Sequence, residues 1–473
     1  MRFIPGLLAL GFLVILPTGL SGRQHGCNLI RSGDWNIFNA GAPNEVVFMG
    51  GPVHFECDGG ITVKADSAVR MPERLQLIGQ VFYGDSVKTL TSRQLDYFPR
   101  EGRLFARGDV EYLDRATGST IQGQELHHER ESAVRAESRT VVQGRPHGVF
   151  RPQRRDGAAA DTATQPFEVD AEWMEFIGQR AFRASGNVEL VRGALRGFSN
   201  WAEFDNETER LVLTGSARVL DEQYELTAER IEAVLVGEQL SELFASTNAR
   251  LTGEDVTIES YEIRMFTDDG ALSRLVARTR GGLPDPNADR VRATAEELLL
   301  LADSLDVLAP GQRIETLIAV GRAYAERTAD TVDVGLPEIA AKDWVRGDTI
   351  TGHFAPATKA ADPDTAASAA AADSSRNEVV LERLIASGPN GTAQALFRFR
   401  DRNTGPEDPP AISYTIADRI VLVLRNGEVE KAEAVGENQD IRGIHLQPNR
   451  RSERAERPSG QNDAAAAEKT GSS

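Results

Sequence analysis

The chain is 473 residues long, 40% hydrophobic, and carries 71 acidic against 53 basic side chains, for a formal net charge of -18. This acidic balance excludes charge-driven binding to nucleic acid or to anionic lipid surfaces, and we expect no nucleic-acid partner. It leaves open a lipid held in an apolar groove. The length is compatible with two or three domains, although a linear array of units spreads its core thin.

Residues 1–22 have the features of an export signal. Arg2 precedes an apolar run from Phe3 to Leu16, and small residues follow up to Gly22. The run is shorter than the ~20 residues that a membrane-spanning helix prefers. We therefore predict a signal peptide, with an uncleaved N-terminal anchor as the alternative.

The only two cysteines are Cys27 and Cys57. In an exported protein they can pair, because the compartments outside the cytosol are oxidising. Two cysteines with no further pattern do not decide between a disulfide and two free thiols.

A strand-turn-strand unit at Thr89–Tyr112 organises the rest of the chain. Its second segment places apolar or small residues at every other position, so that they share one face of a strand. Pro99 and Gly102 lie between the two segments, as expected of a turn. The alternating residues are Leu104, Ala106, Gly108, Val110 and Tyr112.

The same pattern recurs along the sequence, with a glycine at the centre of most copies. Successive glycines of the clean copies are 28 or 29 residues apart: Gly51, Gly79 and Gly108, then Gly186 and Gly215. A small residue followed by an acidic one often begins the preceding strand, as in Ala65-Asp66, Ala228-Glu229 and Ala417-Asp418. A fixed period in this range predicts a stacked array in which each unit buries its apolar face against its neighbours.

Breaks in the pattern divide the array. Low-complexity or Pro/Ala-rich stretches lack a periodic apolar face and are predicted to be linkers or disordered inserts. The predicted organisation is a signal peptide or anchor at 1–22, β-repeats at 45–150, a linker at 151–166, β-repeats at 167–280 and at 291–354, a disordered Ala-rich insert at 355–376, β-repeats at 377–447, and a disordered tail at 448–473.

Two segments conflict with this organisation by composition. Thr227–Leu240 and Ala293–Leu308 are rich in Ala, Glu and Leu, which favour helices. Both fall in phase with the first strand of the repeat, and tertiary context overrides propensity. We predict strands for both, and expect the run Leu298–Leu301 to bury both faces of its strand or to extend an apolar groove.

The search for catalytic or metal-binding chemistry is negative. None of the seven histidines has a metal-ligand spacing, and His127-His128 is expected to be an ordinary surface pair. The sequence has no nucleophile elbow and no phosphate-binding loop. The four tryptophans are scattered along the sequence, unlike the aromatic platform of a polysaccharide-acting enzyme. We expect no enzymatic activity, no catalytic residues, no cofactor and no metal site.

The repeat resembles the OstA family, which includes LptA, LptC and the N-terminal domain of LptD. Ala106-Arg107-Gly108-Asp109-Val110 and Ala184–Leu190 carry the resemblance most closely, and it extends over roughly residues 45–440. The resemblance implies a tandem, open β-jellyroll of stacked antiparallel strands in the periplasm, with lipopolysaccharide acyl chains in its groove. It also implies partners of the same family that join by edge-strand addition. An association with the inner or outer membrane stays open.

A strand array with one apolar face must either bury that face or expose a slot, and a slot suits acyl chains. The alternative is a closed core in a non-lipid scaffold or interaction solenoid of the cell envelope. The candidate groove residues are Leu75, Leu77, Val81, Leu104, Val110, Tyr112, Phe182, Val188, Leu190, Leu211, Leu213 and Val219.

Overall fold

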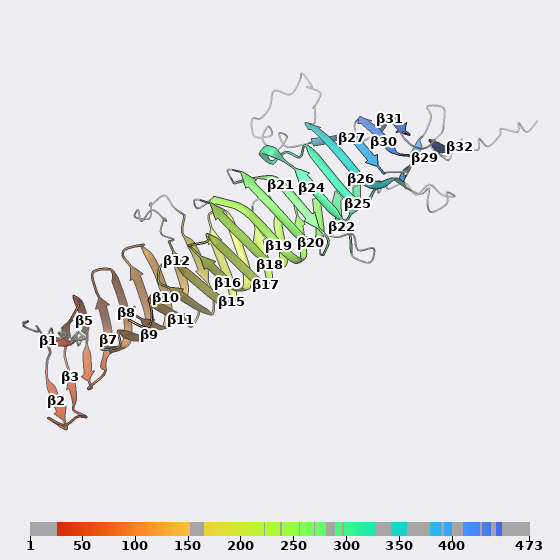
Figure 1. The fold of residues 1–473 in the computed structure, drawn as a ribbon. Coiled ribbons are helices and arrows are strands. Elements are labelled where there is room, and N and C mark those ends of the chain that lie inside the picture. Colours follow the sequence, from red (N-terminus) through yellow and green to blue (C-terminus); the bar gives the residue numbers. More distant parts are fainter. Residues whose placement is uncertain are drawn as a thin grey trace, which may run out of the picture. The chain divides into compact units, whose positions relative to one another are not determined.

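The fold is built almost entirely of antiparallel β-strands, in a computed structural model (Figure 1). The prediction of an all-β fold of stacked antiparallel strand repeats is confirmed. The structure describes residues 26–151, 165–221, 223–236, 239–254, 256–268, 270–280, 289–295, 298–327, 342–356, 379–388, 392–399, 410–425, 428–436 and 441–446.

The chain divides into two compact units, residues 1–253 and 254–473. The strands of the first unit are β1 (Cys27–Arg31), β2 (Trp35–Phe38), β3 (Val46–Met49), β4 (Val53–Cys57), β5 (Ile61–Ala65), β6 (Ser67–Arg70), β7 (Leu75–Gly84), β8 (Lys88–Phe98), β9 (Arg103–Asp114), β10 (Ser119–Glu129), β11 (Arg139–Gln143), β12 (His147–Phe150), β13 (Phe167–Asp170), β14 (Trp173–Ile177), β15 (Ala181–Arg192), β16 (Leu195–Asp205), β17 (Arg210–Leu220), β18 (Glu225–Val236) and β19 (Gln239–Thr252).

Each long strand of the first unit bends at a corner near its middle. In β7, Leu75–Ile78 pairs with β6, whereas the end of the strand, from Phe82 to Gly84, pairs with β5. The register against β8 shifts between Ile78 and Val81. The two halves of the strands therefore belong to two walls: a first wall on the side of Leu75–Ile78, and a second wall on the side of Val81–Gly84.

The repeated glycines lie at these corners. Gly79 has φ +73° and Gly186 has φ +78°, a left-handed conformation in which a Cβ is costly. A Cβ on Gly186 would also lie 2.7 Å from Glu172 Oε2. Gly186 O accepts a hydrogen bond from Glu172 N at 3.0 Å, and the Glu172 carboxylate accepts one from Asn187 Nδ2 at 2.9 Å at the same corner. The other corner glycines with positive φ are Gly108, Gly215 and Gly321.

A second type of corner alternates with the glycine corner and was not predicted. The hydroxyl of Ser92 donates to the carbonyl of Gln94 at 3.0 Å, and Ser199 donates to Trp201 O at 2.9 Å. Both serines lie where the register shifts, in β8 and β16. A side-chain hydroxyl thus satisfies a backbone acceptor where the strand ladder is interrupted.

The two walls of the first unit face each other across an apolar interior. Tyr83 on the second wall contacts Tyr97 on the first, with ring centroids 5.7 Å apart. Phe167 on the second wall lies 4.8 Å from Phe204 on the first. Alternate residues along each strand are buried on this inner face, which is the pattern that the sequence predicted.

The second unit continues the antiparallel pattern with shorter strands toward the C-terminus (Figure 1). Its elements are β20 (Val256–Asp268), β21 (Ala271–Arg278), β22 (Val291–Ala295), β23 (Leu298–Ala302), β24 (Ser304–Leu308), the 3-10 helix η1 (Pro310–Gln312), β25 (Thr316–Arg327), β26 (Asp343–Pro356), β27 (Val379–Ser387), β28 (Ala393–Phe399), β29 (Ala411–Ala417), β30 (Arg419–Arg425), β31 (Glu428–Val435) and β32 (Arg442–Leu446).

Both segments with helix-favouring composition are strands. The described residues of 227–240 fall in β18 and β19, and those of 293–308, apart from Asp303, fall in β22, β23 and β24. Within the leucine run, Leu300 is buried and its three neighbours are half-buried, so both faces of β23 contact protein. The prediction that both segments are strands is confirmed.

Several predicted segments lie outside the described residues. They are the signal peptide or anchor at 1–22, most of the linker at 151–166, almost all of the insert at 355–376, and the tail at 448–473. Within the described ranges, no helix has both the length and the hydrophobicity needed to cross a membrane.

Candidate functional site

The interior of the first unit contains all twelve predicted groove residues. Each has at most 8% of its surface exposed, and Tyr112 is the most exposed of them. Parity along the strands therefore predicted the inner face correctly. These residues form the core between the walls, so any lipid site must lie where that core opens.

The core of the first unit opens at a cavity of about 490 Å³ between the rims of the two walls. Its floor is apolar and comes from both walls: Tyr112, Ile121, Phe150 and Phe176. Polar residues of the hairpin turns surround it, including Lys88 on the rim of the second wall and Arg130 on the rim of the first. An apolar floor with a charged rim suits an amphipathic ligand.

Contacts between the rims close the interior on one side of this cavity. Arg130 Nη2 lies 3.5 Å from Asp85 Oδ2, which joins the rim of the first wall to that of the second. The Tyr83–Tyr97 pair lies on the inner faces of the same region, and burial raises the pKa of both phenols. Both phenols therefore stay neutral at physiological pH, and this side of the cavity is apolar beneath its ion pair.

Phenylalanines close the other side of the cavity. Phe150 on the second wall packs 5.3 Å from Phe182 and 5.9 Å from Phe204, both on the first wall. Phe167 extends the cluster at 6.0 Å from Phe182. Aromatic rings at these separations stabilise each other beyond their burial. We call Phe150, Phe167, Phe176, Phe182 and Phe204 the phenylalanine cluster.

A buried polar group lies beside the cavity, and two of its members, Tyr112 and Thr140, line it. His128 Nδ1 and Thr140 Oγ1 are 2.8 Å apart, and the Tyr112 phenol also hydrogen-bonds to Thr140. The prediction that His127-His128 is a surface pair is wrong for His128, which is 3% exposed. Its side chain lies on the inner face, because neighbouring residues of a strand point to opposite sides. Burial lowers the pKa of His128 to about 3, so the imidazole is neutral.

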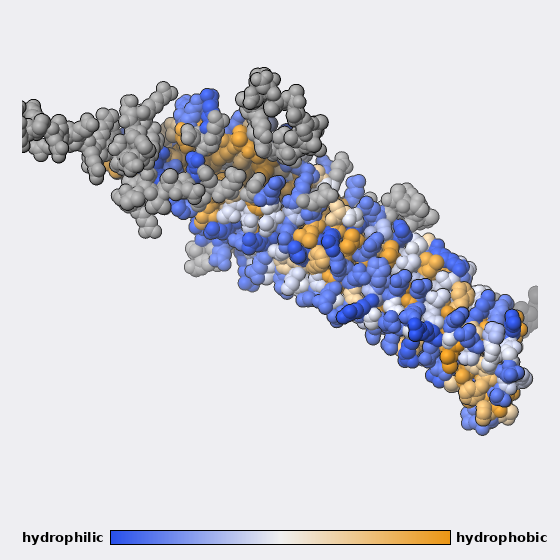
Figure 2. Space-filling view, turned by 180° about the vertical axis from the view of Figure 1, so that it is seen from behind, coloured by the Kyte–Doolittle hydropathy of each residue, from blue (hydrophilic) through white to orange (hydrophobic). Residues whose placement is uncertain are grey.

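Strand β25 of the second unit lines its inner face with smaller residues. Leu317, Ala319, Gly321, Ala323 and Ala325 occupy the repeat positions held by Leu211, Leu213, Gly215, Ala217 and Val219 in the first unit. Leu317 is half-buried, whereas Leu211 is 3% exposed. Figure 2 shows hydrophobic residues gathered in a hollow of this unit, on the face that it draws. The sequence analysis placed no groove candidate here, although the same parity marks the positions.

The N-terminal edge of the first unit is apolar and exposed. All four residues of β2 are exposed, and β2 pairs only with β3 among the described strands. Figure 2 shows hydrophobic residues gathered at this end of the chain. An edge strand with apolar side chains and free backbone groups favours the addition of another strand. The exposed large residues here are Leu29, Ile30, Trp35, Ile37, Phe38 and Phe48.

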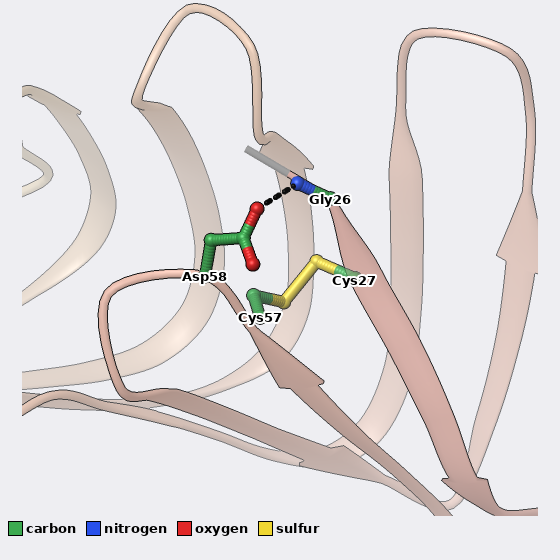
Figure 3. The surroundings of a disulfide bond; sticks show 4 residues. All are labelled: Gly26, Cys27, Cys57 and Asp58. Carbon is green, nitrogen blue, oxygen red and sulfur yellow. Dashed lines mark hydrogen bonds between the residues drawn. A yellow bond between two sulfur atoms is a disulfide. The ribbon is translucent and has the colours of Figure 1, made fainter. Parts of the chain in front are cut away.

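A disulfide fixes this edge to the array. Cys27 in β1 bonds to Cys57 in β4, and the two residues are direct partners in the strand register (Figure 3). Gly26 N donates to Asp58 Oδ2 at 2.8 Å beside it. The pairing that the sequence left open is thus a disulfide in the structure.

The described residues hold no group of three or more His, Cys, Asp or Glu side chains that could bind a metal.

The tryptophans are less scattered in space than in sequence. Trp173 and Trp201 stack with centroids 6.1 Å apart, because both side chains stand on the outer face of the first wall, one on either side of Ser185.

Comparisons with known proteins do not identify a family for this chain. No family model matches the sequence, and no curated protein is significantly similar to it. A solved structure of LptH from Pseudomonas aeruginosa, described as the LptA homologous periplasmic component of a conserved lipopolysaccharide transport device, matches 34% of this chain and 82% of its own. The identity is 12% and the TM-score 0.18. This likeness is too slight to identify the chain as a member of that family.

Proposed function

We propose that this protein binds a lipid in the apolar interior between its two walls, with acyl chains entering where the interior opens. The observation that carries the proposal is the cavity of about 490 Å³, whose apolar floor comes from both walls and whose rim carries charges of both signs, Lys88 and Arg130 with Asp85, Asp114, Glu131 and Glu137. Burying an acyl chain contributes ~0.8 kcal/mol per CH₂, so no charged contact is needed for binding.

For the lipid we propose lipopolysaccharide, because the glycine-centred repeat resembles the OstA family. We further propose that the protein acts in the periplasm, carrying this lipid toward the outer membrane or helping to assemble that route. The Cys27–Cys57 disulfide supports an exported protein, since disulfides persist in oxidising compartments. We propose no enzymatic role.

The proposed protein partners are chains with a similar strand array. Edge addition uses the unpaired backbone groups of a terminal strand, and side chains on both of its faces then set specificity. The β2 edge offers Trp35, Ile37 and Phe38 for such contacts. A charged residue at Ile37 is expected to weaken association with a partner strand without affecting lipid binding.

Photo-crosslinking tests the lipid site. A photoreactive residue at Phe176, in the cavity floor, is expected to crosslink to lipopolysaccharide when the protein is isolated from its own envelope. The matched control is Phe105, which is half-buried on the outer side of β9 and is expected to give no lipid adduct. A second probe at Leu317 tests the inner face of the second unit.

Mass spectrometry of the adducts then identifies the lipid. Lipid adducts at Phe176 or Leu317, and none at Phe105, support the proposal. Equal labelling at all three positions indicates surface adsorption. The absence of adducts at both inner positions would favour the alternative, a scaffold whose core is closed.

A further inference from the structure

The second unit has a cavity of about 430 Å³ that lies apart from the apolar interior. Three arginines border it: Arg290, which precedes β22, Arg322 at the glycine corner of β25, and Arg346 in β26. Tyr324 and Thr392 also line it, and Asp348 is the one acidic residue among the described residues of the lining. Three guanidinium groups around one cavity are unusual in a chain whose net charge is -18.

Only one of these arginines is neutralised by an acid in its contacts. Arg322 Nε donates to Asp303 Oδ1 at 2.8 Å. Arg346 Nε instead donates to the neutral Gln394 Oε1 at 3.1 Å, and its guanidinium lies 5.4 Å from the Trp344 ring centroid. Arg290 Nη1 donates to the backbone carbonyl of Arg322 at 3.1 Å. Arg290 and Arg346 together carry two positive charges and Asp348 carries one negative charge, so these three residues give the lining a net charge of +1.

The surrounding contacts hold these side chains in place. Stacking on Trp344 and the bond to Gln394 fix the guanidinium of Arg346, so less freedom is lost when it binds a ligand. Arg290 is tied to the backbone at the β25 corner. Guanidinium groups bind phosphate oxygens through paired, charge-assisted hydrogen bonds.

We propose that this cavity is an anion site for a phosphate or pyrophosphate group, with Arg290 and Arg346 as its principal ligands. The group can belong to a free anion or to a phosphorylated lipid headgroup, since the chemistry of recognition is the same. The site lies on side chains that the acyl-chain proposal does not use, so either can fail without the other.

Calorimetric titration of the full chain with inorganic pyrophosphate at low ionic strength tests the site. Arg346→Gln is expected to weaken binding ~10-fold or more, since a charge-assisted hydrogen bond is lost. Asp348→Asn is expected to strengthen binding, because it removes the only negative charge of the lining. The control is Arg442→Gln, on the exposed strand β32, which should leave the affinity unchanged.

Arg346, Asp348 and Arg442 are all exposed, so each variant is expected to keep the fold. Thermal unfolding of each variant checks this. Phosphatidylcholine vesicles doped with phosphatidic acid then compete for the site. Displacement of pyrophosphate assigns the site to a lipid headgroup, and its absence assigns it to a free anion. Equal affinities of the parent protein, Arg346→Gln and Asp348→Asn, or no pyrophosphate binding at all, would overturn the proposal.

Discussion

The two units use the same strand-and-corner repeat but fill it differently. The first unit buries aromatic rings between its walls, including the phenylalanine cluster and the Tyr83–Tyr97 pair. In β25 of the second unit the comparable inner positions hold the alanines Ala319, Ala323 and Ala325, although other strands of this unit bury larger aliphatic residues such as Leu275 and Ile350. Among the described residues, the aromatic contacts of the second unit are instead on the outer face. The ring centroid of Trp344 lies 6.3 Å from that of Tyr324 and 6.1 Å from that of Tyr414.

This difference bears on two properties of the strand array: its stability and its capacity to admit a ligand. Large rings from facing walls fill the interior and confine any ligand to the remaining opening. In β25 the alanines are buried, but the inner face is partly uncovered at Leu317, which is half-buried. We therefore expect the first unit to be the more resistant to unfolding and the second to admit a ligand at more positions along its inner face.

The largest expected effect compares the same repeat position in the two units. Leu211→Asp places a charge in the filled core and is expected to destabilise the first unit by on the order of 3–5 kcal/mol. Leu317→Asp changes a half-buried residue and is expected to cost only about 1 kcal/mol of lost apolar burial. Urea denaturation of both variants measures the two costs. Equal losses would contradict the difference between the units.

The disulfide provides a second test that is specific to the first unit. Cys57→Ser removes a covalent link across 30 residues and is expected to lower the unfolding free energy by about 3–4 kcal/mol. Hydrogen exchange should rise in β1, β2 and β4, and stay unchanged in the second unit. Cys27→Ser is the matched control, because it must give the same loss if the bond alone is responsible.

Acid sensitivity caused by a buried histidine is a third property expected of the first unit. The pKa of His128 is lowered from its usual 6.5 to about 3 by burial, so only the unfolded chain takes up this proton between those values. Stability is therefore full above pH 6.5 and falls by about 1.4 kcal/mol per pH unit between pH 6.5 and 3.

Measuring unfolding free energy at several pH values checks this expectation. His128→Gln removes the titrating group and should flatten the profile in this window. The half-exposed neighbour His127 is the comparison: burial lowers its pKa as well, but less than that of His128, so His127→Gln should flatten the profile less than His128→Gln. An unchanged slope in His128→Gln would mean that other groups carry the acid sensitivity.

Sequence periodicity was sufficient to predict the strands of the repeats and their inner faces, because alternation directly reflects burial in a sheet. It did not predict β1 and β2, which precede the repeats. It marked Gly79 and Gly186 as repeated positions, but the bend of the strands at these glycines required the structure. The phenylalanine cluster could not be predicted from the sequence, because Phe150 and Phe204 come into contact only when the two walls face each other. The serine corners and the burial of His128 likewise depend on which residue of a strand lies at a bend.

The smallest expected effect concerns the corner itself. In β19 the corner residue is Thr247, with φ +65°, whereas the second unit keeps Gly321 at φ +78° in β25. A β-branched side chain is strained in this conformation. Thr247→Gly is expected to relieve strain of ~1–2 kcal/mol and to give back up to ~1 kcal/mol through the flexibility of glycine in the unfolded chain. The net gain is a few tenths of a kcal/mol to about 1 kcal/mol.

Thermal unfolding of Thr247→Gly against the reverse change, Gly321→Thr, measures this effect. The reverse change is expected to be clearly destabilising, because a Cβ on Gly321 would also meet the side chain of Asp303, 2.9 Å from its Cβ atom. If Gly321→Thr leaves stability unchanged, the left-handed corner is not what the repeated glycine provides. If Thr247→Gly destabilises, contacts of the threonine side chain outweigh its strain, and the two units differ at their corners as well as in their cores.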